Sequence, residues 1–281
     1  MSGEMAGNDA VSRPGTVDVL VVKWGGSLQQ APQPYQEVCE VVALGWGVTC
    51  VCGGGPAISE SMREQGLEVR FHQGLRVTDL ATLEVVRKTF SQKILPQTCR
   101  KLAELGGRAE AIPGEEIFTA VRQRLSDEST GEELELGWVG EIITVDPSPV
   151  WSRLSRRTIP VISPLARGKE AQECYNVNAD LAAAHLAAAL HAQGLIYLTD
   201  VPGVLRKPSE PASSIPWITQ EMVEDLLRSG GISGGMIPKL KGGLLALSRG
   251  VPIVWLLDGR VPGALQQVLW EGKGPGTRVI P

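Results

Sequence analysis

Short, nearly continuous apolar runs alternate with amphipathic segments along most of the chain. The apolar runs are typical of buried strands, which we expect at Val17–Val22, Gly47–Cys52, Arg108–Ile112, Ile159–Ser163, Leu195–Leu198 and Pro252–Leu257. Helical patterns lie between them, at Tyr35–Leu44, Ala57–Gln65, Leu80–Leu105, Ala179–Gln193, Thr219–Ser229 and Lys239–Arg249. Buried strands separated by helices predict an α/β fold, a three-layer α/β/α sandwich around a mainly parallel open sheet.

Three segments depart from this alternation. Residues 1–16 are polar and aperiodic, which predicts a flexible tail before a domain that spans residues 17–281. The stretch Arg122–Val145 is polar and turn-rich around Asp127–Gly131, which predicts β-hairpins extending from the sheet. Pro96 falls inside the longest helical pattern, so a kink or break is expected there.

Composition narrows the range of functions. The chain has 281 residues, 43% of them apolar, with a formal net charge of −4 and a pI near 5.6. This balance provides no global basic field, so nucleic acid and acidic membranes are poor candidate partners. The N-terminal stretch carries neither an apolar targeting core nor an arginine-rich amphipathic pattern, and no apolar run approaches membrane-spanning length. A cytoplasmic location is therefore expected.

Cysteine and histidine usage argues against disulfides and metal sites. The five cysteines are odd in number, scattered and mostly embedded in apolar runs, as expected for reduced core thiols. The three histidines form no HExxH motif, and no CxxC motif occurs. A zinc site therefore has little support, and we assign no metal ligand.

Glycines follow the expected strands. In "VLVVKWGGS" a buried run ends on Lys23 and Gly25-Gly26, and the second strand leads into Gly53-Gly54-Gly55 before a helix. Ligands bind at the carboxyl ends of parallel strands, where glycines admit them and free helix-start N–H groups attract anions. An ammonium at the end of a buried strand needs an anion or a route to water. The glycine run alone is equally compatible with a tight strand–helix turn.

Further polar clusters occupy corresponding places later in the chain. "NVNAD" at residues 176–180 precedes an alanine-rich helix, where it can act as a plain N-cap, although three polar groups exceed what one cap requires. "LTDVPGVL" ends another strand, and "GGISGGMIPK" delivers Lys239 to a helix start, against the helix dipole. No GxxxxGK[ST] occurs, and no GxGxxG follows a strand, so any phosphate site belongs to another type.

Together these motifs resemble the amino acid kinase family. The segments that carry the resemblance, in order, are "VVKWGG", "CGGGPAI", "GLRVTD", "GWVGEI", "NVNAD", "LTDVPGVL" and "GGMIPK", and the match covers Val17 to Pro281. It is strongest toward the acetylglutamate kinase branch. The resemblance implies phosphoryl transfer from ATP to the γ-carboxylate of N-acetyl-L-glutamate in arginine biosynthesis, with residues 17–175 binding acetylglutamate and residues 176–281 binding ATP.

The resemblance also implies roles for individual residues. Lys23 and Lys239 would stabilise the charge on the transferring phosphoryl group, and Asp180 would hold both ammonium groups in place. Substrate contacts are implied for Gly54, Gly55, Arg76, Asn176 and Asn178, with Arg76 clamping the α-carboxylate. Nucleotide contacts are implied for Gly25, Gly26, Asp200, Val201, Pro202, Gly203, Val204, Leu205, Gly231, Ile232 and Ser233. Mg²⁺ would arrive with ATP, held largely by phosphates and water.

Some positions depart from the family pattern, and two alternatives stay open. Cys52 replaces the usual histidine before the glycines, Ser91-Gln92-Lys93 replaces an Asn-Lys pair, and Pro113–Glu116 replaces a glycine-rich turn. One alternative is a sister kinase acting on a carrier-protein-linked aminoadipate or glutamate. The other is a non-catalytic amino-acid sensor, which would have to explain why Lys23, Asp180 and Lys239 are present. The resemblance further implies a homodimer through the helix at Leu80–Leu105. Arginine-inhibited hexamers of the family carry an interlacing N-terminal helix, and the tail here is short and aperiodic, so we expect little arginine inhibition.

Overall fold

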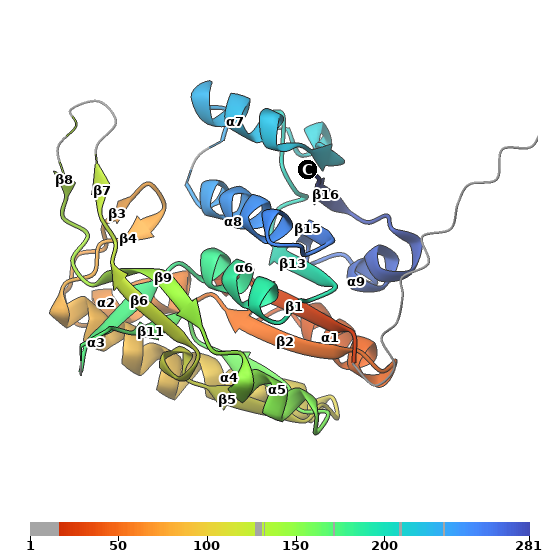
Figure 1. Ribbon diagram of the computed structural model, residues 1–281, viewed down its shortest axis with the longest axis horizontal. Coiled ribbons are helices and arrows are strands. Elements are labelled where there is room, and N and C mark those ends of the chain that lie inside the picture. Colours follow the sequence, from red (N-terminus) through yellow and green to blue (C-terminus); the bar gives the residue numbers. More distant parts are fainter. Residues whose placement is uncertain (1–16, 127–130, 132, 171, 208–209, 233) are drawn as a thin grey trace, which may run out of the picture.

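The computed structural model describes residues 17–126, 131, 133–170, 172–207, 210–232 and 234–281. The expected tail, residues 1–16, lies outside the described residues. An eight-stranded sheet forms the centre of the molecule (Figure 1). Its spatial order is β14 (Trp217–Ile218), β16 (Gly276–Val279), β15 (Ile253–Asp258), β13 (Gly194–Thr199), β1 (Val19–Trp24), β2 (Gly47–Cys52), β10 (Ile159–Ile162) and β5 (Ala109–Ile112).

The sheet is mainly parallel, as the sequence predicts. Among its pairings only that of β15 with β16 is antiparallel. The chain places β2 on one side of β1 and returns much later to place β13 on the other side. This change of direction opens a crevice at the carboxyl ends of β1 and β13, where ligands of such sheets bind.

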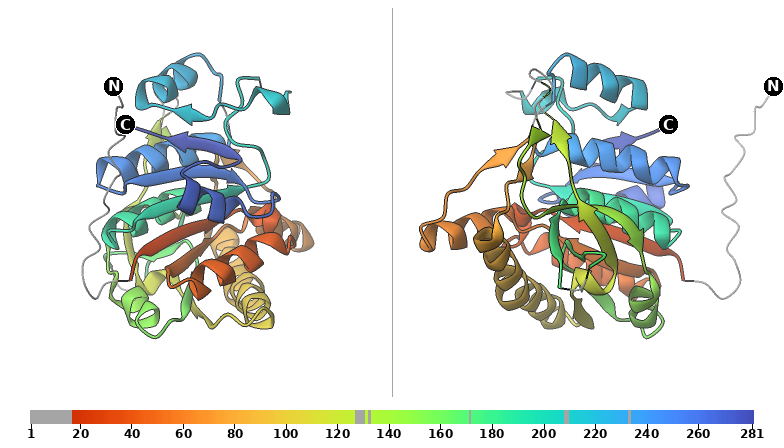
Figure 2. Two further views of the ribbon diagram at one scale, coloured as in Figure 1. Left: turned by 90° about the vertical axis from the view of Figure 1, so that its right-hand side faces the viewer. Right: turned by 60° about the vertical axis from the view of Figure 1, so that its left-hand side comes forward.

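Helices cover both faces of the sheet, which confirms the three-layer sandwich (Figures 1 and 2). One face packs against α5 (Ser148–Leu154), α6 (Ala179–Ala189) and α8 (Met236–Ser248), with α7 (Gln220–Arg228) next to α8. The other packs against α1 (Gln33–Ala43), α2 (Gly55–Glu64), α3 (Leu80–Lys88), α4 (Leu95–Glu104) and α9 (Ala264–Gln266). Side chains of β1 alternate between the two cores, since successive residues of a strand face opposite sides.

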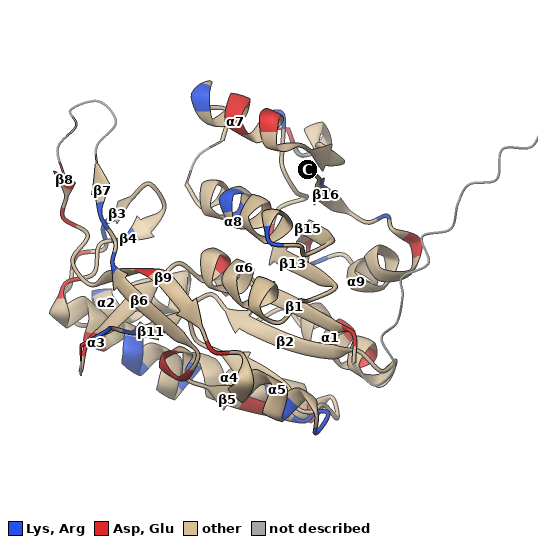
Figure 3. Cartoon of the chain, viewed as in Figure 1, with Lys and Arg blue, Asp and Glu red and all other residues tan. Residues whose placement is uncertain are grey.

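Strand β1 corrects one expected boundary. It runs to Trp24 rather than ending at Val22, because its ladder with β2 and β13 continues through the pairs Trp24–Cys52 and Trp24–Leu198. Lys23 therefore lies inside a buried strand. It is the one charged residue of the central strands β13, β1, β2 and β10, all of which the structure describes in full. Figure 3 shows how few charged residues lie in the centre of the sheet.

The predicted hairpin region belongs to a small closed barrel. Its strands are β6 (Phe118–Arg122), β9 (Val139–Val145), β12 (Cys174–Val177) and β11 (Leu165–Arg167). Two hairpins lie beside it, β7–β8 (Leu125–Ser126 and Glu133–Leu134) and β3–β4 (Phe71–His72 and Leu75–Arg76). Leu75, Leu136 and Val139 form a separate apolar cluster between these elements. The antiparallel hairpins are confirmed, whereas the barrel was not predicted.

The longest helix is interrupted near Pro96, as expected. A π-helical turn over Thr89–Ile94 separates α3 from α4, and Pro96 lies in the first turn of α4. Proline removes one backbone donor of the helix, and the wider turn lies immediately before it. The side chains of Phe90 and Ile94 on this turn are buried against the glycine turn after β2.

The cysteines are free, as predicted. Cys50, Cys52 and Cys174 are buried, while Cys39 and Cys99 are half-buried. Burial is the largest cause of a raised thiol pKa in all five, and it raises that of Cys52 to about 12. These thiols are therefore protonated packing groups rather than nucleophiles. Among the residues that the structure describes, no helix has both the length and the apolar character that a membrane span requires.

Candidate active site

A cavity of about 290 Å³ opens at the carboxyl ends of β1, β2 and β13. Its walls come from both halves of the chain, because β1 and β2 precede the barrel and α6, β13 and α8 follow it. Of the predicted site residues, those that line it are Lys23, Gly25, Gly26, Gly54, Gly55, Arg76, Asn176, Asn178, Asp180, Asp200 and Lys239.

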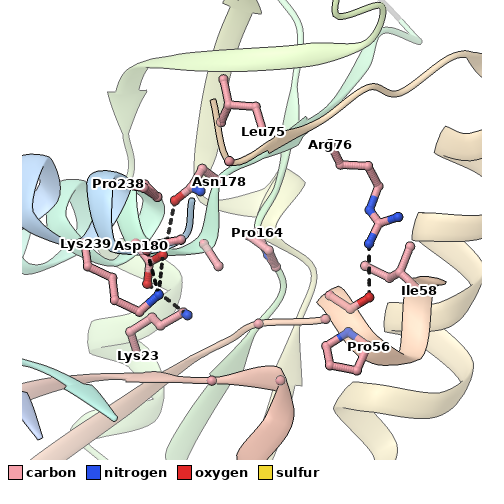
Figure 4. Close-up of a pocket in the computed structure, with 18 of the residues that line it drawn as sticks. Lys23, Pro56, Ile58, Leu75, Arg76, Pro164, Asn178, Asp180, Pro238 and Lys239 are labelled. Carbon is pink, nitrogen blue, oxygen red and sulfur yellow. Dashed lines mark hydrogen bonds and ion pairs between the residues drawn. The ribbon is translucent and has the colours of Figure 1, made fainter. Parts of the chain in front are cut away.

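Two lysines share one carboxylate at one end of this cavity (Figure 4). Lys23 Nζ lies 2.9 Å from Asp180 Oδ1, and Lys239 Nζ lies 3.3 Å from Oδ2. Lys239 also donates to the Gly235 carbonyl at 2.9 Å. Lys23 and Asp180 are buried and Lys239 is nearly so, because β1, α6 and α8 converge here. The trio carries a net charge of +1, which suits the binding of an anion.

Proton affinities at this end follow from burial and mutual charge. For Asp180, burial by itself favours the neutral acid, but the charges of Lys23 and Lys239 outweigh it and lower the pKa below its ordinary value. For Lys239, burial is the main cause of a lowered pKa, opposed by Asp180 and reinforced by Lys23. The carboxylate is therefore firmly ionised, whereas Lys239 loses its proton more readily than an ordinary lysine.

Asn178 holds the start of α6 in position. Its Oδ1 accepts from the backbone N–H groups of Asp180 at 2.8 Å and Leu181 at 3.1 Å, so it is the N-cap of the helix. This is the cap that the sequence left open as one interpretation of "NVNAD". The cap fixes the first turn, and Tyr197 Oη donates to the Asp180 carbonyl at 3.2 Å. Together they place the Asp180 side chain between the two lysines.

Arg76 occupies the other end of the cavity without an acidic partner. Its guanidinium donates to Gly55 O at 3.0 Å and to Ser59 Oγ at 2.8 Å, and lies over the Phe71 ring, 4.6 Å from the centroid. No ion pair formed by the described residues includes Arg76, which is only 7% exposed. Burial, and secondarily Arg63, lowers its pKa to about 10. A buried cation without a counterion is suited to binding an anionic ligand group.

The glycine turn after β2 lies between the two ends. A side chain at Gly54 would collide with Ile58, Phe90 and Ile94 at 2.7–2.9 Å, and one at Gly26 would lie 2.8 Å from Pro56. Gly55 begins α2, so its N–H belongs to the unpaired first turn of that helix. Gln29 Nε2 donates to the Gly53 carbonyl at 2.8 Å and so holds the turn in place. The backbone here can approach a ligand closely.

Asn176 faces the cavity from β12. Its Nδ2 donates to Thr78 Oγ1 at 3.1 Å, and Thr78 Oγ1 in turn donates to the Arg76 carbonyl at 2.7 Å. The two predicted substrate residues Asn176 and Arg76 are thus joined through one hydroxyl group. Thr78, Phe71, Ser59 and Gly235 were not predicted as site residues.

Part of the predicted nucleotide segment lies away from this cavity. Asp200 and Thr199 line it, but Val201–Leu205, Gly231 and Ile232 do not, and Ser233 is outside the described residues. Val204 is buried in the core on the α6–α8 face, where its N–H donates to Thr277 Oγ1 at 2.8 Å. Ile232 is also buried in this core. Nucleotide binding by Asp200–Leu205 and by Gly231–Ser233 stays a prediction.

The departures from the family pattern lie next to the cavity rather than inside it. Cys52 is buried, and its Sγ lies 3.9 Å from Thr98 Oγ1, a weak contact at the end of β2. Lys93 donates to Ser61 Oγ of α2 at 3.1 Å. Glu115 lies near Arg87, 3.8 Å from its Nε. None of these three residues lines the cavity that contains the lysines.

Comparison with known proteins agrees with this geometry. Residues 18–257 match the amino acid kinase family. The acetylglutamate kinase of Akkermansia muciniphila is 38% identical over 93% of this chain and 89% of its own length. That of Pelotomaculum thermopropionicum is 40% identical over 92% of this chain and 91% of its own. A solved structure from Streptococcus mutans superposes with a TM-score of 0.78 at 26% identity, covering 93% of this chain and 98% of that one.

Proposed function

The chain belongs to the amino acid kinase family, and we propose that it phosphorylates the γ-carboxylate of N-acetyl-L-glutamate with ATP, in arginine biosynthesis. One observation carries the proposal. The same cavity holds a lysine pair on one carboxylate at one end and an arginine without a counterion at the other. A dicarboxylate with one reacting and one anchored carboxylate matches these two ends.

The reaction joins a γ-carboxylate oxygen to the γ-phosphorus as the bond from that phosphorus to the ADP oxygen breaks. It yields ADP and an acyl phosphate, and the carboxylate nucleophile needs no general base. Catalysis then depends on alignment and on cations that stabilise the charge of the transferring group. In this proposal Lys23 and Lys239 supply those cations, and Asp180 positions them. Gly25 and Gly26 admit the phosphates, while Gly54 and Gly55 offer backbone N–H donors to the substrate.

Arg76 would bind the α-carboxylate, and Asn176 the acetamido group. The nucleotide would enter beside Asp200 and Gly25, continuing toward Val201–Leu205 and Gly231–Ser233. Mg²⁺ would come with ATP and offset phosphate charge. Within the part of the chain that the structure describes, no three His, Cys, Asp or Glu residues form a metal-binding group. Since Asp180 is engaged by both lysines, this donor set fits an ion held mainly by phosphates and water.

The location and assembly belong to the same proposal. We infer a cytoplasmic enzyme with the acetylglutamate end in residues 17–175 and the ATP end in residues 176–281. A homodimer would form through the helix that contains α3 and α4. Size-exclusion chromatography with light scattering measures this state directly, and a monomer would contradict it.

Acyl phosphate trapped by hydroxylamine tests the function. Purified protein with ATP and Mg²⁺ is given N-acetyl-L-glutamate, L-aspartate or N-acetyl-L-aminoadipate, and ADP release is followed in parallel. We expect turnover with acetylglutamate that collapses in Lys239→Ala. ATP binding without turnover on any of the three would instead favour a carrier-linked substrate or a sensor.

A further inference from the structure

Thr78 joins two elements of the site without lining the cavity. It is fully buried, two residues after β4, and its hydroxyl oxygen lies 2.7 Å from the Arg76 carbonyl and 3.1 Å from Asn176 Nδ2. Both neighbours line the cavity. Since Thr78 itself has no access to a ligand there, any influence on the substrate must pass through these two contacts.

The direction of the two hydrogen bonds is determined by elementary donor counting. A threonine hydroxyl has one proton, and a carbonyl oxygen can only accept. Two oxygens 2.7 Å apart require a proton between them, so the hydroxyl donates to Arg76. The Thr78 oxygen is then left to accept, and its partner must be the amino group of Asn176 rather than its oxygen. The Asn176 amide is therefore turned with its nitrogen toward Thr78.

We propose that Thr78 is a positioning residue that holds the Asn176 amide with its oxygen free to accept the amide N–H of an N-acylated substrate. The carboxamide carries oxygen and nitrogen on opposite sides of Cγ, so anchoring the nitrogen leaves the oxygen for the ligand. Among the described residues no donor is recorded for Asn176 Oδ1, whereas Asn178 Oδ1 already accepts two backbone donors.

The backbone around Thr78 keeps this arrangement rigid. Thr78 N–H donates to the Leu136 carbonyl at 2.9 Å, and Trp138 N–H donates to the Thr78 carbonyl at 2.6 Å. Asn176 N–H donates to the Trp138 carbonyl at 2.9 Å, so Trp138 holds both partners. A side chain at Gly137 would lie 2.3 Å from the Thr78 carbonyl, so the two segments pass at their closest possible approach. Thr78 and Asn176 therefore cannot separate without breaking this bridge.

This inference rests on the proposed function and deepens it, because it names the substrate group that Asn176 would recognise. The site would select an acylated amino group through its N–H. An ester analogue, with oxygen in place of the amide nitrogen, has the same shape but offers only a lone pair to Asn176 Oδ1. The ester oxygen and Asn176 Oδ1 are both acceptors, so they would face each other without a proton between them. A site built for an N–H donor binds such an analogue poorly.

The test compares two substrates and three proteins. N-acetyl-L-glutamate and its ester analogue, 2-acetoxyglutarate of the same configuration, are assayed by hydroxylamine trapping with wild type, Thr78→Ser and Thr78→Val. We expect wild type and Thr78→Ser to prefer the amide in kcat/KM by about 10- to 100-fold. In Thr78→Val we expect this preference to fall to within about threefold of unity, with the KM for ATP unchanged.

The outcomes separate the inference from its premise. If wild type phosphorylates neither compound, the proposed function fails. If wild type prefers the amide and Thr78→Val keeps that preference, or loses activity on both substrates equally, Thr78 is only a packing residue and the inference is overturned. Should Thr78→Val fail to fold, as judged by circular dichroism, Thr78→Ala replaces it in the same ratio measurement, which is independent of the amount of active protein.

Discussion

The two ends of the cavity solve the problem of a buried cation in opposite ways. Lys23 and Lys239 keep a permanent anion, Asp180, whereas Arg76 relies on neutral oxygens and the face of Phe71. The permanent anion holds the lysines in place through every cycle, as is needed for groups that stabilise a transition state. An arginine without a counterion instead gains most when a ligand brings one. In the proposed function, this difference separates a catalytic end from a binding end.

The largest effect that would sharpen this comparison is loss of a lysine. We expect Lys239→Ala to lower kcat by about 10²- to 10³-fold, since it removes a cation aimed at charge that develops in the transition state. Steady-state kinetics by ADP release measures it. Lys241→Ala, an exposed lysine on the same helix, is the matched control. If only KM for acetylglutamate changed in Lys239→Ala, this end would be a binding end after all.

Stability without ligands should separate the two ends next. Lys23→Met removes the cation 2.9 Å from Oδ1 of buried Asp180 while Lys239 remains, and we expect it to lower the free energy of unfolding by roughly 1.5–3 kcal/mol. Arg76→Met removes a buried cation that has no counterion, so we expect a change below about 1 kcal/mol. Urea unfolding of the free proteins compares them. A larger loss in Arg76→Met than in Lys23→Met would contradict the distinction.

Substrate affinity should respond most at Arg76. We expect Arg76→Ala to raise KM for N-acetyl-L-glutamate by about 10- to 50-fold, because a charge-assisted bidentate contact is lost. KM for ATP should stay within about twofold, since Arg76 belongs to the opposite end of the cavity. Arg63→Ala, an exposed arginine on α2, controls for the local charge. An equal rise in both KM values would point to a collapsed cavity rather than a lost anchor.

The smallest effect is in the alkaline pH profile of kcat. Because the pKa of Lys239 lies below the ordinary lysine value of 10.5, its ammonium is lost at lower pH than that of a free lysine. We therefore expect kcat to fall, about tenfold for each pH unit, beginning below pH 10.5. Lys239→Arg keeps its charge at that pH and should move the fall upward. An alkaline limb that is identical in both proteins would exclude Lys239 as its source.

The sequence predicted the parts of the fold that are buried and regular. The runs at Gly47–Cys52 and Ile159–Ser163 became β2 and β10 almost unchanged, because parallel strands that are covered on both faces leave a continuous apolar run. The short strands β3, β11 and β14 were missed. They have two or three residues each, too few for a period, and owe their form to partners elsewhere in the chain.

The site divides in the same way. Lys23, Asp180 and Lys239 could be named in advance, because each was expected at the end of a strand or the start of a helix and matches a family motif. That they meet at 2.9 and 3.3 Å depends on three elements converging, which no local pattern records. Thr78 and Phe71 carry no local signal, since Thr78 meets Asn176 across 98 residues of chain and an aromatic residue in a hairpin is ordinary.

The late return of the chain to β1 has a consequence for biosynthesis. One edge of β1 pairs with β2, and the other pairs with β13 (Gly194–Thr199), which follows about 170 residues later in the chain. At translation rates of roughly 5–20 residues per second, the apolar edge of β1 waits about 10 to 35 seconds for its partner. During that interval it is an unpaired strand edge, the kind of surface that chaperones bind and that aggregates when left bare. The strand that carries Lys23 therefore keeps one edge unpaired until β13 has been synthesised.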